Sequence, residues 1–224
     1  MARHIADYGR AGVPVEADGR LNAVAFQRNH GPIGEVLLRY LASASGDVLE
    51  LGSGTGQHAS AFARLLPNLT WWPSDLNDTH LRSIAAWREY AGLANLKPPV
   101  RIDLAQKDLH LRELGLPSEF AAMFCANVLH IAPWSAAEGL LADAGRHLRS
   151  DGRLFIYGPF RRDGVHNAPS NEAFDTGLRA DNPAWGVRDT ADLRALAERV
   201  KLTLAAIVEM PANNAILVFE RPAA

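Results

Sequence analysis

A short apolar segment runs directly into a loop of alternating glycines, and this junction constrains the fold more than any other feature of the chain. Residues 48–51 read Val-Leu-Glu-Leu, and Gly52-Ser53-Gly54-Thr55-Gly56 follows. Residues 59–66 then have the composition of a compact helix closed by Pro67. Glycine permits positive φ angles and has no Cβ to obstruct a ligand. The segment therefore predicts a strand, a tight turn and a helix. The turn either binds a ligand or only connects the two elements.

Strand-like and helix-like segments alternate along most of the chain, which favours a parallel sheet with helices on both faces. Near the end, two apolar runs (202–209 and 215–220) are joined by a short link that predicts an antiparallel hairpin. The other expected strands are 69–72, 100–104, 120–126 and 154–157, and the other expected helices are 32–41 (with Pro32 in its first turn), one after Asp75, 135–148 and 189–200.

Composition places the chain among soluble globular proteins and bounds its partners. Its 224 residues suffice for one α/β domain, which we expect over residues 23–224 after a flexible arm or lid at 1–22. A formal net charge of -2 gives no general attraction to nucleic acid. No apolar run reaches the roughly 18 residues of a membrane helix, and the first residues lack the apolar core of a signal peptide. With one cysteine in the chain, we expect a cytoplasmic protein.

The residues around the glycine loop narrow its ligand. The loop lacks the lysine and hydroxyl residue that end a P-loop, which argues against a triphosphate. Glu50 stands just before the glycines, where a carboxylate repels a phosphate and suits a cation. S-adenosylmethionine carries a sulfonium and an ammonium group. The predicted contacts of the loop with this cofactor involve Glu50, Gly52, Ser53, Gly54 and Gly56.

Two aspartates follow the next strands, at the sheet edge where parallel α/β proteins bind ligands. Asp75 can accept hydrogen bonds from ribose hydroxyls, although it can also cap the following helix. Asp103 closes the expected third strand, near the place of an adenine amino group, and Leu104 beside it can pack on the ring. The alternative for Asp103 is a solvated loop residue.

These residues resemble motif I and its surroundings in class I S-adenosylmethionine-dependent methyltransferases. More narrowly, the chain is similar to the methyltransferase-like protein 26 family of uncharacterised predicted methyltransferases. The resemblance implies a Rossmann-like sheet of seven strands, mostly parallel with an antiparallel last strand, and it supplies no substrate. It covers nearly everything after residue 25, in the stretches 28–29, 52–59, 72–75, 127–134, 157–164, 169–175, 185–189 and 209–214.

The N-terminal segment commonly folds over the cofactor in this architecture. Asn29 can then bond the methionine carboxylate. His58, in the first turn after the glycine loop, either touches the methionine end or packs on the N-terminal arm.

The catalytic face is expected after strands four and five. Asn127 and His130 follow strand four, with Asn127 also a candidate cofactor contact, and Tyr157 ends strand five. Arg161 and His166 lie in a polar loop of the kind that often acts as a lid. His130 can act as a base or orient the acceptor. The alternatives are a histidine bonded to backbone, a core tyrosine and a solvated loop. No two histidines have helical ligand spacing, so no metal is expected.

The leading hypothesis is therefore a methyltransferase for a small-molecule acceptor, with oxygen, nitrogen or sulfur as the methylated atom, acting as a monomer or homodimer. An NAD-type oxidoreductase needs Gly-x-Gly-x-x-Gly, whereas Gly52, Gly54 and Gly56 alternate. A non-catalytic module that binds S-adenosylmethionine remains the other alternative.

Overall fold

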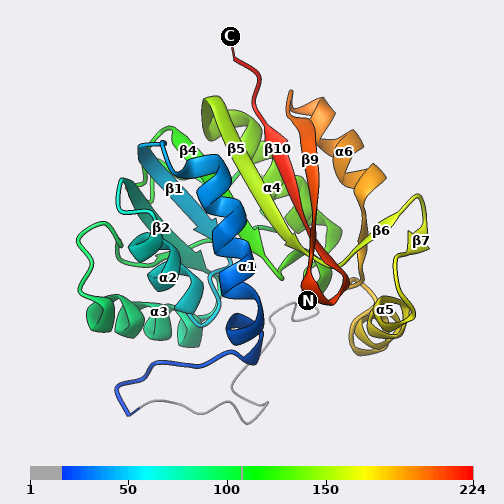
Figure 1. The fold of residues 1–224 in the computed structure, drawn as a ribbon, viewed down its shortest axis with the longest axis horizontal. Coiled ribbons are helices and arrows are strands. Elements are labelled where there is room, and N and C mark those ends of the chain that lie inside the picture. The colour runs from blue at the N-terminus through cyan, green and yellow to red at the C-terminus, as the bar shows by residue number, and fades with distance from the viewer. Residues whose placement is uncertain (1–16, 107, 224) are drawn as a thin grey trace. The chain divides into compact units, whose positions relative to one another are not determined.

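The computed structural model describes residues 17–106 and 108–223 (Figure 1). Seven strands form one sheet in the order β3-β2-β1-β4-β5-β10-β9, and helices flank it. The pairs β1–β2, β2–β3 and β4–β5 are parallel, whereas β10 runs antiparallel to both β5 and β9. This confirms the predicted seven-stranded, mostly parallel α/β fold. The chain divides into two compact units at residue 102, which are described in turn.

The first unit carries the predicted strand, glycine turn and helix. Its elements are α1 (Val24–Leu41), β1 (Gly46–Leu51), α2 (Gln57–Leu65), β2 (Leu69–Asp75), α3 (Asp78–Ala91) and β3 (Val100–Arg101). Helix α2 packs against α1, α3 and β2. The glycine loop therefore lies at the carboxyl end of β1, between that strand and the start of α2.

Helix α1 begins eight residues before Pro32, which was expected in its first turn. Pro32 instead lies inside the helix, where it removes one backbone hydrogen bond. The face of α1 that contains Asn29, Ile33, Val36 and Leu37 is buried, and this packing supports the helix on both sides of the proline. Because proline is common in the first turn of a helix, Pro32 suggested that the helix starts there, and the predicted start was therefore wrong.

Strand β3 is shorter than predicted and leaves Asp103 beyond its end. The strand comprises Val100 and Arg101, and the backbone N–H of Ile102 makes one more bond to the carbonyl of Asp75, at 3.2 Å. Asp103 therefore does not close the third strand.

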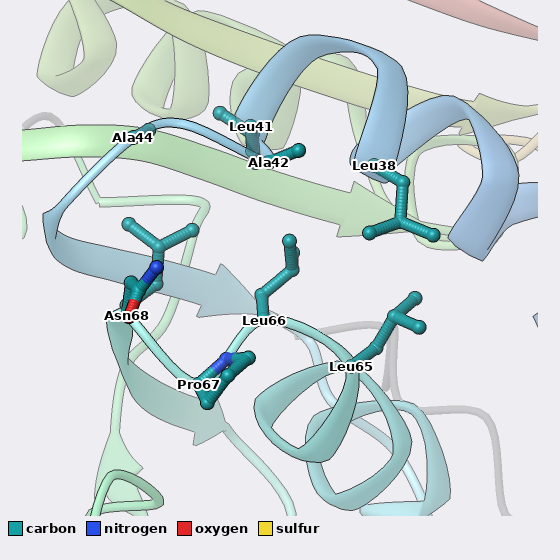
Figure 2. Close-up of a pocket in the computed structure, with 9 residues that line it drawn as sticks. Leu38, Leu41, Ala42, Ala44, Leu65, Leu66, Pro67 and Asn68 are labelled. Carbon is teal, nitrogen blue, oxygen red and sulfur yellow. The ribbon is translucent and has the colours of Figure 1, made fainter.

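A small cavity of about 70 Å³ lies where the end of α1 meets the link between α2 and β2 (Figure 2). Leucine side chains from both helices, among them Leu38 and Leu65, line it. Ala44 precedes β1 and Leu69 begins β2, so the cavity lies at the amino ends of these strands. The glycine loop is at the opposite end of β1, and the cavity is therefore separate from it.

The second unit contains the rest of the main sheet and the small sheet β7-β6-β8. Its elements are β4 (Phe120–Ala126), η2 (Leu129–Ile131), α4 (Trp134–His147), β5 (Leu148–Gly158), β6 (Phe160–Arg162), β7 (Val165–His166), α5 (Pro169–Asp181), β8 (Arg188–Asp189), α6 (Thr190–Arg199), β9 (Thr203–Met210), η3 (Pro211–Asn213) and β10 (Asn214–Glu220). The predicted terminal hairpin is confirmed as β9 and β10. Helix α6 begins at Thr190, and Asp189 caps it by accepting a bond from the N–H of Ala191 at 2.9 Å.

The segment expected to be a long loop after β5 is largely structured. It forms the hairpin β6–β7, and α5 follows beside β7 (Figure 1). Two of the three buried residues of α5, Asn171 and Asp175, are polar. The helix therefore has little apolar periodicity, which explains why its sequence did not predict it.

Candidate functional site

The glycine loop is held against the end of β2 by backbone hydrogen bonds. The N–H of Ser53 donates to the carbonyl of Ser74 at 2.8 Å, and the N–H of Gly54 donates to Oδ2 of Asp75 at 2.8 Å. Gly52, Gly54 and Gly56 have φ angles of 74°, 57° and 88°. The alternating glycines are thus needed because all three occupy the left-handed region, which other residues adopt at a cost.

Two of these glycines have different surroundings. A Cβ on Gly56 would lie 2.7 Å from Cα of Ile84, so this glycine lets the loop approach α3. A Cβ on Gly54 would meet nothing within 4 Å. Gly54 therefore faces open space, where a ligand can approach the backbone.

The carboxylate of Asp75 is nearly buried, with 8% of the residue exposed, and it is oriented from several sides. Besides Gly54, it accepts a hydrogen bond from the N–H of Asn77 at 2.9 Å, and Nδ1 of His80 lies 3.1 Å from Oδ1. The helix cap is Asn77, whose side chain accepts from the N–H of Thr79. Because a carboxylate has about four acceptor positions, Asp75 retains capacity for ribose hydroxyls, and that role remains a prediction.

Glu50 is buried behind the loop and binds β2. Its Oε2 accepts a hydrogen bond from Nε1 of Trp71 at 2.6 Å, and the residue is 2% exposed. Burial raises the pKa of Glu50 to about 8, and the charge of Asp75 adds to the rise while the Trp71 bond opposes it. A positive ligand would favour the ionised form of such a carboxyl group.

Asn29 and His58 lie together, but their polar groups bind each other. Nε2 of His58 is 2.9 Å from Oδ1 of Asn29, and the imidazole ring packs against Phe26 and Phe62. Burial lowers the pKa of His58 to about 3, so the ring is neutral at neutral pH. The pair links α1 to α2, and its predicted contacts with a cofactor remain untested predictions.

Gln57 is a site residue that the sequence did not indicate. Its Oε1 accepts from the N–H of Ala23 at 2.6 Å and from the hydroxyl of Thr55 at 3.1 Å, and its Nε2 donates to Asn22. The N–H of Leu21 donates to the hydroxyl of Ser83, which donates to the carbonyl of Thr55. The stretch from Leu21 to Ala23 is thus tied to the glycine loop, although residues up to 22 were expected to be a flexible arm. Residues 1–16 of that arm lie outside the described residues.

Asp103 and Leu104 form a turn in the second unit. The side chain of Asp103 accepts from the N–H of Ala105 at 2.9 Å, and Leu104 is buried against the backbone of Gly139. The predicted adenine contacts of both residues remain predictions.

The structure brings together the residues that follow β4 and β5. Asn127 adopts a positive φ of 59°, and its N–H donates to the carbonyl of Tyr157 at 2.9 Å. Tyr157 is buried at 5% exposure. His130 lies in η2 with its ring edge-on to that of Phe174, at 5.4 Å between centroids. Burial, followed by the nearby charge of Arg188, lowers the pKa of His130 to about 4.

Arg188, another residue that the sequence did not single out, holds the segment around His130. Its guanidinium donates to the carbonyls of Leu129, Ala132 and Ala184. The N–H of Gly186 also donates to the carbonyl of His130, at 2.9 Å. These backbone contacts could not be predicted from the sequence, because the region around Arg188 has no clear periodicity.

Arg161 and His166 are directly opposite each other in the β6–β7 hairpin. Nε2 of His166 lies 3.3 Å from Oδ2 of Asp175 on α5. Burial opposes ionisation of Asp175, but bonds from the N–H of Val187 and from Arg179 outweigh it and lower its pKa. The predicted lid residues therefore belong to an ordered network.

Among the described residues, no three His, Cys, Asp or Glu side chains gather as metal ligands. Nor does any helix within residues 17–106 and 108–223 have the length and apolar character to cross a membrane.

Comparison with known proteins shows the family of this chain and proteins that share its fold. A family model described as "Protein of unknown function (DUF938)" matches residues 20–221. An O-methyltransferase family protein from Burkholderia thailandensis has a similar structure, with a TM-score of 0.72 and 16% identity over 89% of this chain and 58% of that one.

Two further structures have the same fold. CalO1, a methyltransferase in calicheamicin biosynthesis solved in its SAH-bound form, has a TM-score of 0.64 and 19% identity, over 84% of this chain and 52% of that one. The YcgJ protein from Bacillus subtilis has a TM-score of 0.66 and 14% identity, over 88% of this chain and 100% of that one. The chain spans little more than half the length of the first two. At these identities the comparisons show only that the chain shares the fold of these proteins.

Alanine substitutions at the two glycines should separate packing from ligand approach. Gly56→Ala should lower the free energy of unfolding by about 3 kcal/mol, because it combines a left-handed φ with a clash against Ile84. Gly54→Ala should cost only about 1 kcal/mol, since its Cβ meets open space. Urea denaturation of both variants measures the difference. Equal losses would contradict the assigned roles.

Glu50 should make the stability of the ligand-free protein depend on pH. Because its pKa is raised to about 8 in the folded chain from 4.5, the folded state holds a proton that the unfolded state releases between these values. Stability should therefore fall as pH rises from about 5 to 8, by up to about 1.4 kcal/mol per pH unit. Glu50→Gln should remove this contribution. Denaturation of both proteins across this range measures it, with Glu35→Gln on the exposed face of α1 as the control that should follow the wild type. Parallel pH profiles for wild type and Glu50→Gln would refute the assignment.

Proposed function

We propose that this chain, which belongs to the DUF938 family of proteins of unknown function, is an S-adenosylmethionine-dependent methyltransferase acting on a small-molecule acceptor. We also propose that the chain is related to the methyltransferase-like protein 26 family, which its sequence resembles. The observation that carries it is the glycine loop at the end of β1, whose Gly54 faces open space and whose backbone is held by Asp75.

The charges around this loop support a cationic cofactor. Glu50 is buried behind the glycines and Asp75 lies beside them. The carboxylate of Asp75 in this position disfavours a phosphate, whereas the sulfonium and ammonium groups of S-adenosylmethionine would be attracted to it. A positive ligand would also favour the ionised form of Glu50, whose pKa burial raises in the ligand-free chain. The fold likeness to proteins described as methyltransferases, one of them solved with SAH, is consistent with this cofactor.

Residues after β4 and β5 are proposed to act on the acceptor. Methyl transfer is an in-line displacement, so holding the nucleophile close to the methyl carbon supplies much of the catalysis. A histidine with a pKa near 4 has little driving force to remove a proton at neutral pH. We therefore assign His130 an orienting role, as a neutral hydrogen-bonding group, with Asn127 and Tyr157 beside it.

A titration with S-adenosylmethionine tests the cofactor assignment. Asp75→Asn should weaken binding at least tenfold, or about 1.4 kcal/mol, because the amide removes the charge and part of the acceptor capacity beside the loop. Isothermal titration calorimetry of the folded variant measures this affinity.

Asp78→Asn is the matched control, since this exposed aspartate pairs with Arg101 and should leave the affinity unchanged. Tight NADH binding without S-adenosylmethionine binding would replace the proposal with an oxidoreductase. Cofactor binding with no release of S-adenosylhomocysteine across broad metabolite pools would favour a non-catalytic binding module.

Substitution of His130 should affect turnover more than cofactor affinity. His130→Gln is expected to lower kcat at least tenfold, because an orienting group is lost, with the Kd for S-adenosylmethionine changed less than twofold. Rates of S-adenosylhomocysteine release, measured once an acceptor is found, give kcat. A parallel loss of affinity and turnover would instead indicate a structural role.

A further inference from the structure

Unpaired buried hydrogen-bonding atoms are concentrated in one part of the second unit. Among the described residues, four buried side-chain atoms have no partner. Oδ2 of Asp143 is on α4, and the other three are Nε of Arg161, Nδ1 of His166 and Nε1 of Trp185. An unpaired buried donor costs about 1–3 kcal/mol, so three nitrogens within 25 residues of sequence call for a physical explanation.

Two of these residues, and the segment that follows the third, meet in one network. Arg161 and His166 are directly opposed in an antiparallel pair, so their side chains project from the same face of the hairpin. His166 reaches Asp175, and the segment that follows Trp185 passes the same carboxylate, since the N–H of Val187 donates to Oδ1 at 2.7 Å. The hairpin, α5 and the segment before β8 thus meet around Asp175.

Asp175 determines which nitrogen of His166 is available. Its carboxylate is fixed by Val187 and by Nε of Arg179, 3.1 Å from each oxygen, and it faces Nε2 of the imidazole. With Nε2 facing Asp175, the ring presents Nδ1 on its other side. The N–H groups of Arg161 and Trp185 lack an acceptor, and Nδ1 of His166 lacks a partner.

The charge around these donors is positive. Arg188 interacts electrostatically with Arg161, Arg179 and Asp175, and Arg161 also interacts with Asp189. The group therefore contains three positively charged and two negatively charged side chains, without counting His166. Both oxygens of Asp189 already accept from backbone, from the N–H of Ala191 and of Gly164. The surplus charge favours an anion over a neutral ligand.

We propose that Arg161, His166 and Trp185 bind a carboxylate group of the acceptor. This inference rests on the proposed methyltransferase function and names its substrate class, a small carboxylic acid. A carboxylate accepts several hydrogen bonds and suits the unpaired N–H groups of Arg161 and Trp185, with Nδ1 of His166 as a third donor when the ring carries both protons. Phe174 on α5 is 44% exposed and contacts the ring of His130, so an aromatic acid, benzoate, is used as the probe.

The indole N–H of Trp185 provides a direct reporter. In a ¹⁵N-labelled full-length chain, we expect benzoate to shift this resonance saturably, whereas benzamide, which has the same shape and no charge, leaves it in place. Trp185→Phe assigns the signal by removing it. Arg161→Gln and His166→Gln should each weaken benzoate binding at least tenfold.

Arg162→Gln is the matched control, because Arg162 is exposed and pairs with Glu209, and it should bind benzoate like the wild type. Equal responses to benzoate and benzamide, no saturable shift, or equal weakening by Arg162→Gln would overturn the proposal. Should Arg161→Gln fail to fold, the benzoate affinity of His166→Gln decides the question.

Titration of the same variants with S-adenosylmethionine separates this inference from the proposed function. Arg161 is not among the predicted cofactor contacts, so Arg161→Gln should retain cofactor affinity. Loss of benzoate binding with intact cofactor binding supports the carboxylate site. A chain that binds benzoate at Trp185 but never S-adenosylmethionine would refute the methyltransferase proposal while leaving the carboxylate site in place.

Discussion

The hydrogen bond from the N–H of Gly54 to the carboxylate of Asp75 is the contact on which the first unit depends. It joins the loop after β1 to the end of β2 and fixes the direction of the carboxylate. Asn77 and His80 hold the other oxygen, while Gly56 lets the loop approach α3. A left-handed backbone at three glycines is costly for other residues, and this set of contacts is what makes the conformation stable.

The two acidic groups beside the loop differ in their environment. Asp75 accepts hydrogen bonds from backbone N–H groups, whereas Glu50 is buried with one bond to Trp71 and has a raised pKa. The energy of burying Glu50 would be recovered in part when a cation binds nearby. The proposed cofactor would therefore be recognised through charge as well as through the shape of the loop.

The second unit arranges its polar residues through backbone contacts. Arg188 and Gly186 hold the segment around His130, and Asp175 holds His166 and the segment after Trp185. This network leaves Nε of Arg161, Nδ1 of His166 and Nε1 of Trp185 buried without partners. A site that is complete except for an acceptor is what a small carboxylic acid would require.

The sequence by itself determined the alternation of strands and helices, the glycine loop and the reversed hairpin, because these depend on local periodicity and on residues with special backbone preferences. Tertiary structure decided the rest. Pro32 lies inside α1 because packing outweighs a lost hydrogen bond, and α5 forms although Asn171 and Asp175 replace apolar residues on its buried face. The roles of Gln57 and Arg188 come from partners far away in the chain, which no local pattern encodes.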